Sequence, residues 1–378
     1  VLSVLAPRAP APAGRRVPLW ALATGVLLAM ALVSALLVEP ARAVQGLKIG
    51  YFYLLIPMVL WRHPFTARDR DRLVTILMVT AWLVAAYDLL QQLLGPVRLN
   101  ALGYEYNTAI RFAGSFLRTF STFVQPFPFA LYVMVAILIG ASVALADPRR
   151  LRNLVFLVSI PVLSVAMATS IVRASYLGLV LGLLVLAWFR FRLVGVLPLV
   201  LLAIVVLLPA SVLSTALSSS SLGERQSGWE ATGSLVLSSP WGVGIGATGA
   251  AAEKVADVTG SDTSTYQPDN YYFKMLVELG VVGMWLFVVI VASGFTEAVR
   301  VTRRSRDPDS ALALGVAATM AAVAAASVVA TYLEIFPMDV LFWLWLGVLT
   351  CIPRDDASGS TPSRCDPAEA ASRPTSVS

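Results

Sequence analysis

Residues 214–283 read STALSSSSLGERQSGWEATGSLVLSSPWGVGIGATGAAAEKVADVTGSDTSTYQPDNYYFKMLVELGVVG and form the longest polar interval of an otherwise apolar chain. The interval opens with a run of serines, turns at Pro240 through closely spaced glycines, and ends where an apolar helix is expected. A long loop between membrane spans costs chain entropy, and such loops are usually functional. We therefore expect the chemistry of this protein in this interval, close to the membrane surface.

The composition around this interval is that of a membrane protein. Of the 378 residues, 58% are hydrophobic and only 13% are charged, and the mean hydropathy is +0.78. Soluble domains carry about 25% charged residues, so the composition excludes an ordinary soluble fold. Cys351 and Cys365 provide neither a disulfide framework nor the spacing of a metal site.

Apolar runs predict an all-α polytopic membrane protein, because about 20 apolar residues suffice to cross a bilayer as a helix. About ten such runs occur, at approximately 18–38, 47–61, 73–95, 122–146, 154–171, 174–189, 193–213, 271–296, 309–331 and 336–352. We expect an N-terminal segment at 1–17, a transmembrane domain at 18–352 with loops at 96–121 and 214–270, and a disordered tail at 353–378.

The basic residues predict the orientation of the chain. Most of the 28 lysines and arginines lie in the two terminal segments and in alternate short connections, which the positive-inside rule places in the cytoplasm. Both termini are then cytoplasmic, and the two loops are extracytoplasmic. The single histidine, His63, lies in a cytoplasmic turn, where it is expected to be an ordinary solvated side chain.

Four of the arginines that this topology places outside, against the rule, are candidates for binding an anion. Arg111 and Arg118 are seven residues apart and share a face if that stretch is helical. Arg173 lies in a very short connection at the membrane surface, and Arg225 precedes Trp229 by one helical turn. A guanidinium pairs two phosphate oxygens at once. The alternative is an arginine that snorkels to lipid headgroups or pairs with a nearby carboxylate.

The end of the long interval supplies a second group of candidates. Asn270, Lys274 and Glu278 are spaced four residues apart and share a face of the span that follows. Glu278 lies about two turns inside the span, where a charge is expected to face a cavity or a partner. A Lys274–Glu278 pair that neutralises itself is the alternative. Asp269 precedes the helix, where it can serve as a helix cap, as a catalytic base, or as both.

Other conspicuous residues carry weaker expectations. The glycines of Pro240–Gly246 are not expected to bind a nucleotide, because no strand precedes them. We expect a turn that brings the backbone close to the membrane or to a ligand. Glu334 and Asp339 flank a short outside turn, which predicts that they are solvated, and Asp88 lies deeper in a span without a predicted role.

Four patterns follow one another in the order known from one family. They are VRASYLGLVLGLLV (172–185), GERQSGWEATGSLVLSSPWGVGIG (223–246), PDNYYFKMLVELGVVGMWLFV (268–288) and LFWLWLGVL (341–349). Together they resemble the O-antigen ligase and polymerase superfamily of bacterial surface-polysaccharide assembly. The likeness extends from about Arg111 to Leu349.

The resemblance implies a membrane glycosyltransferase of the GT-C type that needs no metal or other cofactor. Its donor would be an oligosaccharide on polyprenyl pyrophosphate, and its acceptor a hydroxyl of a glycan or lipid outside the bacterial cytoplasmic membrane. Its partners would be the lipid bilayer and other polysaccharide-assembly proteins, without nucleic acid. The resemblance assigns Arg173 and Arg225 to the pyrophosphate, Asp269 as catalytic base with Asn270 at the acceptor, and Glu278 in support. We add four substrate-binding candidates: Arg111, Arg118, Trp229 and Lys274.

The branch of the family depends on one position. Ligases carry a histidine where this chain has Asp269, and no other histidine is predicted on the outside, which favours a polymerase of repeat units. A ligase that attaches the finished chain remains an alternative. So do a flippase for lipid-linked glycans and a different GT-C enzyme, which would need an acid in the first outside loop, where only Glu39 is present.

Overall fold

The computed structural model describes residues 17–106, 109–113, 116–197, 229, 232–260 and 270–352. Within these residues, seven helices are long and apolar enough to cross a membrane, and two shorter apolar helices, Arg173–Phe189 and Met338–Cys351, accompany them. This confirms the all-α polytopic membrane fold. The run predicted at 193–213 lies mostly outside the described residues, as do the N-terminal segment, the tail and much of the long loop.

The elements follow one another as α1 (Leu19–Leu37), α2 (Pro40–Gly46), η2 (Leu47–Tyr51), η3 (Phe52–Leu54), α3 (Leu55–Arg62), α4 (Ala67–Ala101), β1 (Arg111–Ala113), β2 (Phe116–Arg118), α5 (Pro126–Ala146), α6 (Leu151–Thr169), α7 (Arg173–Phe189), η4 (Arg192–Gly195), α11 (Gly249–Thr259), α12 (Tyr271–Arg304), α13 (Asp309–Ala326), η5 (Tyr332–Glu334), α14 (Met338–Val348) and η6 (Leu349–Cys351). The turn η2 is π-helical, and η3 to η6 are 3₁₀ turns.

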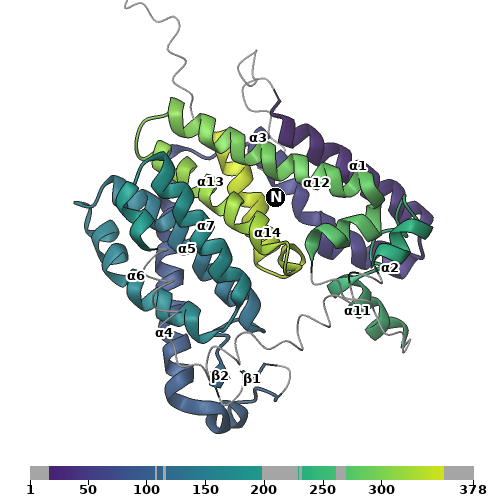
Figure 1. Ribbon diagram of the computed structural model, residues 1–378, viewed down its shortest axis with the longest axis horizontal. Helices are drawn as coiled ribbons and strands as arrows, with labels where there is room; N and C mark the ends of the chain where they lie inside the picture. Colours follow the sequence, from purple (N-terminus) through teal and green to yellow (C-terminus); the bar gives the residue numbers. More distant parts are fainter. Residues whose placement is uncertain are drawn as a thin grey trace, which may run out of the picture.

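The helices form two groups joined through a central helix (Figure 1). Helices α4 to α7 lie on one side of the view, and α1, α2, α11 and α12 on the other. Between them α13 packs against α5, α7 and α12, while α1 packs along α12. The bundle is therefore built around α13, and this explains why nearly all of that helix is buried.

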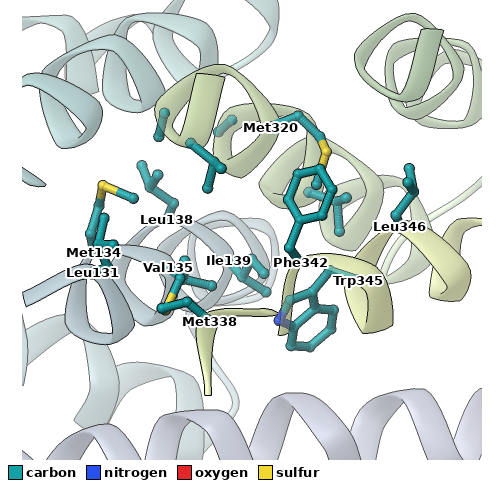
Figure 2. Packing of buried hydrophobic residues seen from close by; sticks show 14 of the residues in the cluster. Leu131, Met134, Val135, Leu138, Ile139, Met320, Met338, Phe342, Trp345 and Leu346 are labelled. Atoms are coloured by element: carbon teal, nitrogen blue, oxygen red, sulfur yellow. The ribbon is translucent and has the colours of Figure 1, made fainter. Parts of the chain in front are cut away.

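The core lies where α5, α13 and α14 meet. Figure 2 shows Ile139 of α5 near Phe342 of α14, whose ring lies next to Met320 of α13, while Val135 of α5 lies beside Met338 of α14. Small residues let the helices approach closely, as is common between membrane helices. A Cβ on Gly315, for example, would lie 2.8 Å from the backbone of Ile139.

Ion pairs fasten one end of the bundle. Arg70 at the start of α4 donates to Asp309 at 2.9 Å and to the backbone oxygen of Cys351 at 2.8 Å. Arg152 at the start of α6 donates to Asp71 at 2.9 Å. The opposite end carries the β1–β2 hairpin, the C-terminus of α6 and the N-termini of α7 and α12, and we call it the hairpin end. It is the end that the positive-inside rule predicts to face outside.

Candidate active site

Arg111 and Arg118 lie side by side on a β-hairpin. They occupy directly paired positions of the antiparallel strands β1 and β2. The expected helical arrangement is therefore wrong, although the pairing still places both arginines together. Arg118 Nε donates to the backbone oxygen of Ser170 at 3.1 Å, and its guanidinium lies 5.1 Å from the centre of the Phe127 ring. These contacts attach the hairpin to the ends of α5 and α6.

Arg173, the first residue of α7, completes a group of three cations that we call the arginine cluster. Burial lowers the pKa of Arg118 below its ordinary value, and the positive charges of Arg111 and Arg173 lower it further. Arg173 is exposed, while Arg111 and Arg118 are half-buried. Like charges that repel one another at an accessible surface are a natural site for a multivalent anion, which relieves the repulsion when it binds.

A break in α12 lies on the other side of the hairpin end. Gly280 interrupts the 34-residue helix with a φ of +68°, a conformation that glycine adopts without strain. The break frees backbone groups that an intact helix would pair internally. Among them are the carbonyls of Val277 and Glu278 and the N–H of Val281.

The segment Pro240–Gly246 takes up these freed groups. Val243 N–H donates to Val277 O at 2.8 Å, Gly244 N–H donates to Glu278 O at 3.1 Å, and Val281 N–H donates to Pro240 O at 3.2 Å. The glycines were expected to allow a close approach, and the partner is the backbone of α12. A Cβ on Gly242 would lie 2.5 Å from Glu278 O, which leaves room only for glycine.

Lys274 is enclosed by two carboxylates next to this break. Its Nζ lies 2.9 Å from Glu278 Oε1 and 3.0 Å from Glu334 Oε2, and it also donates to Thr248 O at 3.1 Å. The side chains of all three charged residues are at most 2% exposed. Tyr51, at the end of the π-helical turn, donates to Glu278 Oε2 at 3.3 Å. We call Lys274, Glu278 and Glu334 the lysine cluster.

The lysine cluster shows which of the two expectations for Glu278 holds: a charge that faces a cavity or a partner, or a Lys274–Glu278 pair that neutralises itself. Glu278 faces a partner, and the ion pair between Lys274 and Glu278 exists. Lys274 also pairs with a second carboxylate, so it does not neutralise Glu278 alone. The solvation expected for Glu334 and Asp339 is wrong, because they are 5% and 4% exposed. Burial raises the pKa of the Glu334 carboxyl, and the charge of Lys274 opposes that shift.

The two clusters flank one turn. Phe127, which contacts Arg118, also packs against Tyr332 with ring centres 6.3 Å apart. Tyr332 and Glu334 belong to the same turn, η5. The hairpin end therefore holds a cationic surface and a buried ion cluster on either side of η5.

Asn270 and Trp229 lie at the start of α12. Asn270 caps the helix, and its Oδ1 accepts from the N–H groups of Tyr272 at 2.9 Å and Phe273 at 3.2 Å. The capping position considered for Asp269 thus belongs to Asn270. The half-exposed Trp229 packs edge-on against Phe273, with ring centres 6.0 Å apart. Trp229 is thereby placed beside the residues that begin this helix.

Two catalytic candidates, Arg225 and Asp269, lie outside the described residues. The structure brings Arg111, Arg118 and Arg173 into one group, and Lys274 and Glu278 into another. Sequence reasoning missed Tyr51, Thr248 and Glu334 as members of the second group. Only the presence of an acid beside a membrane span could have drawn attention to Glu334, and that signal alone does not name its partner.

Gly280→Ala is expected to destabilise the protein. A non-glycine residue at this φ costs about 1–3 kcal/mol, and the added Cβ would lie 2.4 Å from Pro240 O. We expect a lower melting temperature in detergent. Gly25→Ala is the matched control, because its Cβ has open space and alanine favours a helix. Equal melting temperatures for the two variants would contradict the described role of Gly280.

The fold and this site define a polytopic helical membrane protein with a cationic surface at the hairpin end. Residues 154–288 match the family model described as O-Antigen ligase, which supports the O-antigen ligase and polymerase superfamily. The matched segment runs from α6 to α12 and includes Arg173, the Pro240–Gly246 segment and the lysine cluster residues Lys274 and Glu278. The match supports a membrane glycosyltransferase of the O-antigen ligase or polymerase type in general. No curated protein matches the chain.

Proposed function

We propose that this protein transfers a glycan from a polyprenyl-pyrophosphate carrier to an acceptor hydroxyl outside the cytoplasmic membrane, and that it polymerises repeat units of a surface polysaccharide. The arginine cluster carries the proposal. Three guanidinium groups gathered at one end of a membrane bundle match a pyrophosphate held at the membrane surface by its lipid tail. The family match supports the general class of reaction.

The arginines supply charge stabilisation in this proposal. The acceptor oxygen attacks the anomeric carbon of the donor, and the bond from that carbon to the pyrophosphate oxygen breaks. The electron pair leaves with the pyrophosphate, whose added negative charge Arg173 and Arg225 stabilise without a metal ion, with Arg111 and Arg118 beside them. The hydroxyl proton passes to the carboxylate of Asp269.

Two further observations support polymerisation over ligation. Asp269 occupies the position at which ligases of the family carry histidine. The single histidine, His63, precedes α4, whereas the hairpin follows that helix. Helix α4 runs without a break from Ala67 to the residue before Gly95, where its backbone is non-helical. That uninterrupted part corresponds to about 40 Å of helix, so His63 lies too far from the arginine cluster to act as a base there.

Deleting the gene in its source organism tests the proposal. Mass spectrometry of the polyprenyl-pyrophosphate-linked glycans should show accumulated single repeat units, because their polymerisation is blocked. Long chains accumulating on the carrier would instead identify a ligase. Repeat units trapped on the cytoplasmic face would identify a flippase, and an unchanged profile would contradict all three.

A further inference from the structure

One face of α4 supports the two backbone segments that lead to the arginine cluster. Val84, Asp88 and Gln91 are spaced three and four residues apart, so they share this face. Asp88 and Gln91 are both fully buried. Asp88 forms no ion pair among the described residues, and its Oδ1 has no hydrogen-bond partner there. A buried carboxyl without a cation requires an explanation.

Asp88 contacts the end of α6. Thr169 Oγ1 donates to Asp88 Oδ2 at 2.8 Å, and Thr119 Oγ1 in turn donates to Thr169 Oγ1 at 2.8 Å. The N–H of Thr119 also donates to Thr169 O at 3.4 Å. Asp88 therefore orients the hydroxyl of Thr169, the last residue of α6. That hydroxyl in turn binds Thr119, the first residue after β2.

Gln91, one turn further along α4, binds the backbone of the same segment that follows β2. Its Oε1 accepts from the N–H groups of Phe120 at 3.2 Å and Ser121 at 2.8 Å, and its Nε2 donates to Ser121 O at 2.9 Å. Ser121 has a φ of +53°, unusual for a residue other than glycine, and its hydroxyl donates to Val84 O at 2.6 Å. Four hydrogen bonds thus fix a backbone turn that would otherwise be unfavourable.

Each of these two segments leads directly to an arginine. Arg118 precedes Thr119, and Arg173 follows Thr169 by one short connection. We propose that Asp88 and Gln91 are positioning residues that set the separation of Arg118 and Arg173 and so match the pair to the donor pyrophosphate. This inference rests on the proposed function, but the hydrogen-bonded support of the two segments can be tested without a ligand.

The role of Asp88 in this proposal is that of a hydrogen-bond acceptor. Asp88→Asn keeps an oxygen that can accept from Thr169, whereas Asp88→Ala removes it. We therefore expect Asp88→Asn to behave like the natural protein. Asp88→Ala and Gln91→Leu should both loosen the arginine pair.

The ligand-free test measures a distance across the support. Phe116 of β2 and Leu177 of α7 are exposed, so both accept a spin label after replacement by cysteine. The native Cys351 and Cys365 are first replaced by serine. Double electron–electron resonance should give a narrow distance distribution for the parent and for Asp88→Asn, and a broader or shifted one for Asp88→Ala. An unchanged distribution in Asp88→Ala would overturn the proposal.

The second test measures binding of a sugar-free polyprenyl pyrophosphate to the purified protein. Asp88→Ala should weaken binding about tenfold, which is the lower end of the loss expected when a hydrogen bond to a charged group is weakened. It should have no further effect in an Arg118→Ala background, because Asp88 acts through the arginines. Additive effects, or equal losses in Asp88→Asn and Asp88→Ala, would overturn the proposal.

A control separates positioning from general damage. Asn153 is equally buried but lies at the opposite end, where it donates to Asp147 O at 2.8 Å. Asn153→Ala should leave both the distance distribution and binding unchanged. If Arg118→Ala binds the pyrophosphate normally while Asp88→Ala still broadens the distance distribution, the proposed function fails but the support by α4 stands.

Discussion

Arg173→Ala is expected to abolish glycan transfer while the protein still accumulates in the membrane. Arg173 is exposed at the first position of α7, so its removal leaves no cavity in the core. Losing one donor to the charge that develops on a leaving group typically costs about 10²–10³-fold in rate. Arg225→Ala should have the same effect. The measurement is the rate of transfer from a polyprenyl-pyrophosphate-linked donor, together with the amount of folded protein.

Two further variants make this result specific. Arg173→Lys keeps the charge but loses the forked donors, so it should retain partial activity. Arg149→Ala removes an exposed arginine near the ion pairs of the opposite end and should transfer at the natural rate. Transfer by Arg173→Ala and Arg225→Ala at the rate of Arg149→Ala would contradict the mechanism.

The helical membrane fold could be predicted because it depends on local sequence. An apolar run long enough to cross a bilayer has few alternatives to a helix, since every backbone group must be paired within it. The extended hairpin at Arg111 and Arg118 could not be predicted in this way. Seven residues are compatible both with two turns of helix and with a tight pair of strands. The hairpin is held by contacts with Phe127, which lies beyond it at the start of α5, and with Ser170, which is distant in sequence.

The sequence predicted those parts of the candidate site that a single unusual residue marks, and it did not predict contacts between distant segments. Basic residues on the side predicted to be outside indicated the arginine cluster, and a charge inside a predicted span indicated Glu278. The partner Glu334 could not be found, because the fold of three segments brings it to Lys274. The helix break at Gly280 was also hidden, since its freed carbonyls are satisfied by a segment some 35 residues earlier in the chain.

Lys274→Met is expected to be the most destabilising single substitution in the described part of the hairpin end. Methionine fills a similar volume, so packing changes little, but Glu278 and Glu334 lose their only cation within ion-pair distance among the described residues. Leaving buried charges without a partner costs about 3–5 kcal/mol. The melting temperature in detergent should fall accordingly. Lys254→Met is the matched control: Lys254 forms an exposed pair with Asp257, and such pairs contribute about 0–1 kcal/mol.

Removing the carboxylates as well should restore much of this loss. In the triple variant Lys274→Met, Glu278→Gln, Glu334→Gln no charge remains in the lysine cluster, and the amide of residue 278 can still accept from Tyr51. If the triple variant melts well above Lys274→Met, the penalty comes from uncompensated charge, and Lys274 acts chiefly as a counterion. If the triple variant is no more stable than Lys274→Met, that account is wrong, and lost contacts such as the bond from Lys274 to Thr248 O explain the destabilisation. If the triple variant melts as the natural protein does, comparing their transfer rates shows whether the charges themselves are needed for the reaction.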